Sequence, residues 1–213
     1  MDTITYPFQG HSKELIYRVI NKKEGVIVFP TETFYAIGCS ALNSKAIQRI
    51  YSIKSREINK PLLVLVNNWE MLSKFVEPFT ICQKQFLLNY WPGPLTVLLP
   101  VRDGLSKALN LNHDKIGFRI TSSPIANKLI EICDVPIVGT SANISGTEAV
   151  NKINDVQTVF RDKVDLYIDG ANTTGGSPST LIEFSTTRSI EILREGVIPS
   201  NNLNEYANKV LIS

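Results

Sequence analysis

Apolar residues along the chain follow two patterns, one typical of helices and one typical of buried strands. Four apolar residues between positions 15 and 20 recur at helical spacing, and Gly25 is placed to end that helix. The same spacing predicts later helices, with Ser44 as the N-cap of the second and Ser123-Pro124 as the N-cap and first turn of another. These further helices are expected at 44–51, 81–90, 124–132 and 203–210.

Short apolar runs, several of them bounded by glycine or proline, predict buried strands. They lie at 26–29, 62–66, 95–99, 116–120, 136–139, 166–168, 180–184 and 190–193. Helices and strands alternate without a linker, an internal repeat or a low-complexity tract, which predicts one α/β domain over residues 1–213. Residues 171–179, rich in glycine, threonine and serine, form a candidate mobile loop whose composition permits a lid.

The composition is that of an ordinary globular protein and changes this picture little. The chain has 213 residues, 43% of them hydrophobic and 20% charged, with a formal net charge of +2. This balance excludes intrinsic disorder and argues against a surface that coats nucleic acid or anionic lipid. A local basic pocket remains compatible with it.

Cysteines and histidines carry no signature of a disulfide framework or a metal site. Cys39, Cys82 and Cys133 are odd in number and form no CxxC pair, and the two histidines belong to no HExxH motif. The first residues lack the features of a signal peptide, and the longest apolar runs are too short to cross a bilayer. We therefore expect a reduced, cytoplasmic protein with no membrane partner.

Common nucleotide-binding and hydrolase motifs are missing. No glycine precedes a lysine and no two glycines lie two residues apart, which excludes the Walker A loop and the GxGxxG fingerprint. The segment 139–143 approaches a GxSxG elbow but ends in Asn143. Ser141 is therefore interpreted as capping a turn rather than as a nucleophile.

A basic segment between a predicted helix and a predicted strand is the strongest local signal. Residues 54–60 include Lys54, Arg56 and Lys60 against one glutamate, a net charge of +2 in seven residues. In an extended loop Lys54 and Arg56 would point to the same side, and an ammonium beside a guanidinium suits a polyanion such as a triphosphate. The alternative is a solvated basic turn.

Polar residues also follow the predicted strands, where ligands bind in open α/β folds. Thr31, Glu32 and Thr33 come after the strand at 26–29, and Ser141 and Asn143 follow another short apolar strand. A capping turn is the alternative for the first group.

Two arginines lie in or beside predicted strands. Arg119 interrupts the apolar run 116–120, and Arg194 follows the strand at 190–193. A strand arginine that faces a cleft can clamp a carboxylate with two charge-assisted hydrogen bonds. The alternative for Arg119 is a side chain that faces solvent, and the alternative for Arg194 is a salt-bridged strand end.

Seven motifs in one order then indicate a family. FPTETFYAIG, IKSREINKPL, WPGPLT, IGFRI, GTSANISG, PSTLIEF and ILREG run from Phe29 to Gly196, and together they resemble the YrdC/TsaC-like threonylcarbamoyl-AMP synthases. The resemblance implies an open twisted mixed α/β sheet with flanking helices around a concave basic cavity. It also implies the short, single-domain form of the family.

The same resemblance implies a reaction and its residues. L-threonine, bicarbonate and ATP, with Mg²⁺, would give threonylcarbamoyl-AMP and pyrophosphate, which tRNA-threonylcarbamoyl transfer proteins would use to modify the adenosine next to the anticodon. Lys54 and Arg56 are expected to act on the phosphates. ATP binding is assigned to a wider set, namely Arg56, Lys60, Ser141, Asn143 and Arg194. Threonine binding is assigned to Thr33, Arg119 and Thr180.

Two departures from the family pattern bear on threonine binding. Ala36 stands where members often have glycine, and Leu65 stands where many have histidine. We expect these changes to alter the affinity or selectivity for threonine.

Two other functions remain as alternatives. One is a non-catalytic module of the same fold that binds tRNA or double-stranded RNA. The low net charge and the lack of an RNP-type aromatic motif disfavour it, although weak tRNA binding is compatible with these two observations. The related domain of hydrogenase-maturation proteins is disfavoured because those proteins are much longer and carry zinc-finger-like cysteines.

Overall fold

The architecture was obtained as a computed structural model that describes residues 2–22, 24–58, 60, 62–102, 115–170, 173–186 and 188–211. Its strands are β1 (Asp2–Thr5), β2 (Ile27–Pro30), β3 (Tyr35–Ser40), β4 (Leu63–Val66), β5 (Leu95–Pro100), β6 (Lys115–Ile120), β7 (Ile137–Ser141), β8 (Leu166–Asp169), β9 (Thr180–Thr186) and β10 (Ser189–Arg194). Its helices are α1 (Gly10–Ile20), α2 (Ser44–Lys54), α3 (Trp69–Ser73), α4 (Ile81–Leu88), α6 (Pro124–Cys133), α7 (Ile153–Phe160), the 3₁₀ turn η1 (Arg161–Lys163) and α8 (Ser200–Val210).

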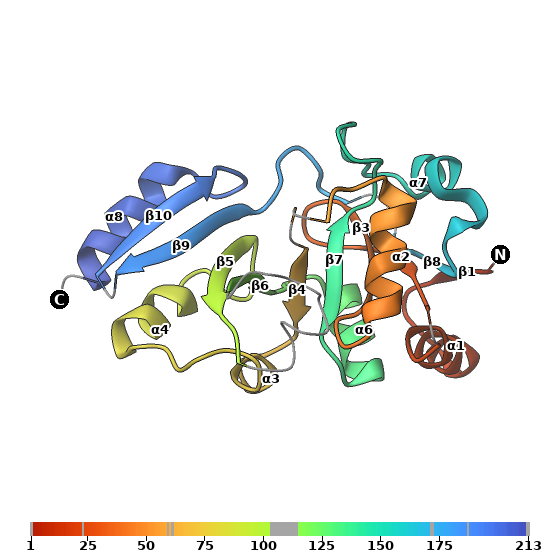
Figure 1. The fold of residues 1–213 in the computed structure, drawn as a ribbon, viewed down its shortest axis with the longest axis horizontal. Helices are drawn as coiled ribbons and strands as arrows, with labels where there is room; N and C mark the ends of the chain where they lie inside the picture. Colours follow the sequence, from red (N-terminus) through yellow and green to blue (C-terminus); the bar gives the residue numbers. More distant parts are fainter. Residues whose placement is uncertain are drawn as a thin grey trace.

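Within these described ranges the strands form one mixed sheet in the order β1-β8-β2-β3-β7-β4-β6-β5-β9-β10. Among the described strand pairs, four are parallel (β1–β8, β2–β8, β4–β6 and β5–β9), and the other five are antiparallel. The β9–β10 hairpin and α8 lie at one end, and β1, β8 and α1 lie at the other (Figure 1). The expected mixed α/β sheet with flanking helices is therefore confirmed.

Helices cover the sheet through their apolar faces. α2 packs against β3, α6 packs against both α1 and β2, and α8 packs against α4 and β10 (Figure 1). In the part of the chain that the structure describes, no helix is both long and apolar enough to cross a membrane.

All eight strands predicted from the apolar runs are present, with ends that differ by one to a few residues. Ser123 caps α6 as expected, its hydroxyl accepting a hydrogen bond from the Ala126 N–H at 3.2 Å. The N-cap of α2 is Asn43 rather than Ser44, because the Asn43 side chain accepts the Ala46 N–H at 3.1 Å.

Gly25 does not end the first helix, which stops at Ile20. A Cβ at Gly25 would lie 1.7 Å from the Val19 carbonyl oxygen, so glycine is required there by a close approach to the helix end.

Besides the short 3₁₀ turn η1, four of the described elements were not predicted, namely β1, β3, α3 and α7. The most consequential is β3, whose six residues are all buried between β2 and β7. It contains Ala36 and Gly38, residues of low strand propensity, so neither alternation nor composition marks it. A strand buried on both faces is specified by its neighbours rather than by its own pattern.

Candidate active site

One face of the sheet forms the floor of a cavity of about 220 Å³. Because side chains of a strand alternate between faces, every second residue of five neighbouring strands lines it. These residues are Leu63 and Leu65 of β4, Gly117 and Arg119 of β6, Thr96 and Leu98 of β5, Gly139 of β7 and Leu181 of β9. Gly117 and Gly139 flank Leu63 in register, and neither carries a side chain into the cavity. The floor is thus apolar apart from one hydroxyl and one guanidinium.

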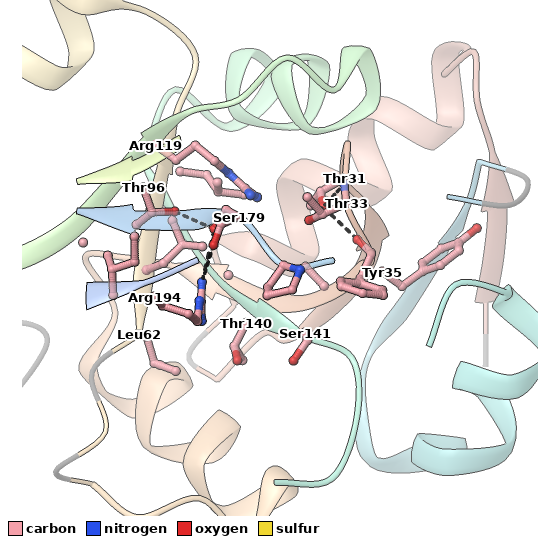
Figure 2. Close-up of a pocket in the computed structure, with 18 of the residues that line it drawn as sticks. Thr31, Thr33, Tyr35, Leu62, Thr96, Arg119, Thr140, Ser141, Ser179 and Arg194 are labelled. Atoms are coloured by element: carbon pink, nitrogen blue, oxygen red, sulfur yellow. Dashed lines mark hydrogen bonds between the residues drawn. The ribbon is translucent and has the colours of Figure 1, made fainter. Parts of the chain in front are cut away.

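The turn between β2 and β3 supplies hydroxyls to the cavity wall. The Thr31 hydroxyl donates to the Phe34 carbonyl at 2.8 Å and accepts the Thr33 N–H at 3.3 Å, and the two threonine hydroxyl oxygens lie 3.1 Å apart. Both residues line the cavity (Figure 2). Thr33 therefore occupies the place after a buried strand where the sequence predicted ligand contacts.

Arg119 is 3% exposed and directs its guanidinium into the cavity (Figure 2). Its Nε lies 3.5 Å from a carboxylate oxygen of Glu32, without forming a hydrogen bond. The other Glu32 oxygen accepts a hydrogen bond from the Thr121 hydroxyl at 2.7 Å, which helps to hold the carboxylate beside Arg119. Arg119 thus faces the cavity and is paired with Glu32, and it does not point to solvent.

Arg194 reaches the cavity from the end of β10. Its Nη2 donates to the Ser179 carbonyl at 2.8 Å and lies 3.3 Å from the Ser179 hydroxyl. That hydroxyl is 2.8 Å from the Thr96 hydroxyl of β5, so the three side chains form a connected group (Figure 2). Instead of the salt-bridged strand end considered as the alternative, Arg194 bonds to the backbone and the hydroxyl of Ser179.

Three arginines from distant parts of the chain share this cavity: Arg56, Arg119 and Arg194. Burial, followed by the charges of Arg119 and Arg56, lowers the pKa of Arg194. Guanidinium groups remain protonated even so, and their mutual repulsion is relieved when an anion binds among them. The cavity is therefore basic, as the family resemblance implied.

Lys54 and Arg56 do not extend side by side, so the expected alternation along a loop is wrong. Lys54 is the last residue of α2, and Ser55 turns the chain with a left-handed φ of 51°. The Lys54 side chain is 1% exposed and contacts Ser141 and Asn143, whereas Arg56 lines the cavity. The helix end and the left-handed turn send the two cations in different directions.

The predicted site residues fall into two groups. Thr33, Arg56, Arg119, Ser141 and Arg194 line the cavity. Lys54, Lys60, Asn143 and Thr180 are not among the described lining residues. Their assigned contacts with ATP and threonine stay predictions.

Lys60 and Thr180 of the second group contact other protein residues. The Lys60 ammonium lies 3.0 Å from the Glu57 carboxylate on an exposed turn. The backbone carbonyl of Lys60 accepts hydrogen bonds from Arg56 Nε and from the Tyr51 hydroxyl, each at 3.1 Å. The Thr180 hydroxyl donates to the Ile198 carbonyl at 2.8 Å and accepts its N–H at 3.0 Å.

Ser179 is a lining residue that the sequence argument missed in favour of Thr180. Strand alternation provides the missing signal: if Leu181 faces the cavity, then Ser179 faces it and Thr180 does not. Thr96 and Thr140 also line the cavity and were not singled out.

The described lining residues include no aspartate, glutamate, histidine or cysteine, and the described part of the chain holds no cluster of three such residues. A resident Mg²⁺ prefers carboxylate oxygens, so this donor set does not fit one.

Both departures from the family pattern lie at the cavity. Leu65 is fully buried in the floor, in register with Arg119, and Ala36 lines the wall opposite Ser141 in the β3–β7 pair. Their effect on threonine affinity stays a prediction.

The candidate lid at 171–179 is described from residue 173 onward, and its first two residues lie outside the described ranges. The Gly175 N–H donates to the Thr33 carbonyl at 2.7 Å, and the Thr173 N–H donates to the Asn151 carbonyl at 3.1 Å. The segment thus reaches the β2–β3 turn that carries the threonine hydroxyls. Whether it closes over a substrate stays a prediction.

Comparison with known proteins shows the family to which this chain belongs. The Sua5/YciO/YrdC family model, described as telomere recombination, matches residues 19–196. A threonylcarbamoyl-AMP synthase of Pyrococcus abyssi is 32% identical over 191 residues, which are 89% of this chain and 56% of that protein. A threonylcarbamoyl-AMP synthase of Idiomarina loihiensis is 35% identical over 162 residues, 75% of this chain and 87% of that protein. This chain therefore spans only about half of the first relative but most of the second.

Solved structures agree in fold. Sua5 of P. abyssi in complex with L-threonine superposes with a TM-score of 0.89 at 28% identity, covering 98% of this chain and 61% of that one. E. coli YciO superposes with a TM-score of 0.79 at 26% identity, covering 93% and 96%. A HypF structure, at 19% identity and a TM-score of 0.71, shares the fold alone. Because the family model covers most of the chain and relatives above 30% identity align along it, the chain belongs to the Sua5/YciO/YrdC family.

Proposed function

We propose that this protein makes threonylcarbamoyl-AMP and pyrophosphate from L-threonine, bicarbonate and ATP, as a nucleotidyltransferase. The observation that carries the proposal is the convergence of Arg56, Arg119 and Arg194 on one cavity with an apolar floor and hydroxyl-bearing walls. Family membership and the names of the relatives support it. The product would serve tRNA-threonylcarbamoyl transfer proteins in the cytoplasm.

The chemistry asks for cations more than for a covalent nucleophile. Threonine's amine and bicarbonate give N-carboxythreonine with loss of water, and its new carboxylate attacks the α-phosphorus of ATP while pyrophosphate leaves. Charge on the phosphates rises in this step, so positioned guanidinium groups stabilise it. Mg²⁺ would arrive with the triphosphate as part of the substrate.

Five of the cavity residues then have specific tasks. Arg119, held in the floor beside Glu32, would pair with the threonine carboxylate through the nitrogens that it directs into the cavity. Thr33 would bind the same substrate from the wall. Arg56, Arg194 and Ser141 would bind the nucleotide from other sides of the cavity.

The deciding measurement is threonine-dependent release of pyrophosphate from ATP and bicarbonate. Wild-type protein is expected to release it, and Arg119→Met is expected to raise the KM for threonine at least about tenfold, because a charge-assisted hydrogen bond is lost. Arg102→Met serves as a control, since Arg102 is exposed and lies 3.7 Å from Glu77 at the rim of a different cavity. Its kinetics should match those of the wild type.

Absence of threonine-dependent pyrophosphate release, with the tRNA-modification partners present, would refute the synthase. Micromolar or tighter tRNA binding at physiological salt without catalysis would then favour the RNA-binding module.

A further inference from the structure

The Lys54 ammonium uses all three of its hydrogen-bond donors inside the protein. Nζ donates to the Ser141 carbonyl, to the Asn143 carbonyl at 2.6 Å and to the Asn143 side-chain oxygen at 3.3 Å. An ammonium has three donors and no acceptor, so none is left for a phosphate. Lys54 is also 1% exposed and is not among the described residues that line the cavity.

The partners of Lys54 belong to one short segment that is held from several directions. The Ser141 hydroxyl donates to the Asn143 side-chain oxygen at 2.6 Å, and the Asn143 amide donates to the Thr147 carbonyl at 2.5 Å. The Ser145 N–H returns a hydrogen bond to the Lys54 carbonyl at 3.1 Å. The end of α2 and residues 141–147 therefore hold each other in place.

The hydrogen bonds of Lys54 favour its charged form, whereas burial opposes that form. Burial, followed by the charge of Arg56, lowers the pKa of Lys54 to about 7. The acceptors that favour the charged form are two backbone carbonyls and one amide oxygen rather than a carboxylate. Lys54 is therefore suited to fixing the backbone of residues 141–143, because the carbonyl groups of Ser141 and Asn143 both accept hydrogen bonds from its Nζ.

The segment fixed by Lys54 carries part of the cavity wall. Thr140 and Ser141 line the cavity at the end of β7 (Figure 2). Lys54 lies behind this wall and touches it from the protein side.

We propose that Lys54 is a positioning residue: it holds the backbone of residues 141–143 so that Thr140 and Ser141 face the ligand, and it does not touch the nucleotide. This replaces the expectation that Lys54 acts on the phosphates beside Arg56. The proposal rests on the proposed function only for what the cavity binds.

Chemical labelling of the wild-type protein tests the proposal without any substitution. Lysines of the folded protein are reductively methylated with formaldehyde and cyanoborohydride, with and without ATP, and each site is quantified by peptide mass spectrometry. Lys54 is expected to stay unmodified in both samples, while Lys60, whose side chain is 57% exposed, is modified. Methylation of Lys54 in the folded protein, whether or not ATP protects it, would overturn the proposal.

A double-mutant cycle tests the route by which Lys54 acts. Lys54→Met should raise the KM for ATP in pyrophosphate release, and adding Ser141→Ala should change it less than twofold further, because the Ser141 side chain is already misplaced. Lys60→Met is the comparison, since its exposed ammonium is independent of Ser141 and its effect should multiply with that of Ser141→Ala. Multiplying effects for Lys54 and Ser141 would contradict the proposal.

The two tests separate this proposal from the synthase. If wild-type protein releases no pyrophosphate, the proposed function fails while the labelling result still decides the role of Lys54. If Lys54→Met does not fold, as judged by circular dichroism and thermal unfolding, the labelling result decides in the same way.

Discussion

At the scale of single residues, the face of the strand on which a side chain lies decides whether that side chain lines the cavity or bonds to other parts of the protein. Ser179 and Thr180 are adjacent and both carry hydroxyls, yet they face opposite ways. Ser179 meets Thr96 and Arg194 in the cavity, whereas Thr180 holds both backbone groups of Ile198. Their substitution should therefore have separable effects.

We predict that Ser179→Ala raises the KM for threonine about threefold to tenfold, because one hydrogen-bonding group of the cavity is lost. Thr180→Val should instead lower the free energy of unfolding by about 1–3 kcal/mol, because it removes the side-chain partner of the partly buried backbone groups of Ile198. Steady-state kinetics and urea unfolding of both variants check this. A threonine KM that rises in Thr180→Val but not in Ser179→Ala would restore Thr180 as the ligand.

At the scale of elements, a few polar side chains tie the helices to the strands that carry the site. Ser123 is one of them: its hydroxyl caps α6 and also donates to the Pro30 carbonyl at 3.1 Å. Pro30 directly precedes the turn with Thr31 and Thr33, so the cap fixes the cavity wall as well as the helix.

Ser123→Ala is expected to lower the free energy of unfolding by about 1–2 kcal/mol and to raise the KM for threonine. Thr80→Ala is the matched variant, because Thr80 caps α4 in a capping box with Gln83, on a helix that packs against α8. It should cost similar stability and leave the kinetics unchanged. Equal kinetic effects of the two substitutions would argue against a link between the α6 cap and the cavity.

Asp165 lies directly before β8. Its carboxylate connects this strand to Arg49 of α2 and to Lys22, which follows α1. Its carboxylate accepts hydrogen bonds from Lys22 at 2.8 Å, from the Val26 N–H at 2.9 Å and from Arg49. Burial alone would raise the pKa of Asp165, but these hydrogen bonds outweigh it and hold the pKa below its ordinary value of 3.8.

A carboxylate with a depressed pKa stabilises the folded state above its ordinary pKa, and this contribution is lost as the pH falls through the folded-state value. Asp165→Asn should therefore lower the free energy of unfolding by about 1–3 kcal/mol at pH 7. The difference from wild type should shrink as the pH falls below about 4. Urea unfolding at pH 7 and pH 3 measures both; a constant difference would contradict the assignment.

At the scale of the whole molecule, the cavity joins elements from much of the sheet. The β2–β3 turn, the floor strands β4 to β7 and the β9–β10 hairpin all contribute lining residues. A ligand that contacts several of these elements is bound by the folded chain and not by the unfolded one, so binding stabilises the fold.

L-threonine is therefore expected to raise the temperature of half-unfolding. The stabilisation should approach about 2.7 kcal/mol when its concentration is a hundred times the Kd. Differential scanning fluorimetry across a threonine titration measures it, with glycine as the ligand control and Arg102→Met as the protein control. The shift should be lost in Arg119→Met, and an unchanged shift in that variant would exclude Arg119 as the main contact.

The sequence by itself determined the regular elements with strong patterns and the approximate place of the site. Mostly apolar runs of three to five residues located eight strands, because such runs have few places other than a buried sheet. Thr33 could be singled out because polar residues directly after a buried strand lie where ligands bind. Arg119 could be singled out because a charged side chain within an apolar strand needs a partner or a cavity.

Only the tertiary structure decided the rest, because it depends on neighbours distant in the chain. β3 carries no pattern of its own and is specified by pairing with β2 and β7. A single left-handed residue at the end of α2 separated Arg56, which faces the cavity, from Lys54, which lies behind its wall. Sequence spacing cannot reveal such a turn or the carbonyl groups that receive the Lys54 ammonium, since those groups lie about ninety residues further along the chain.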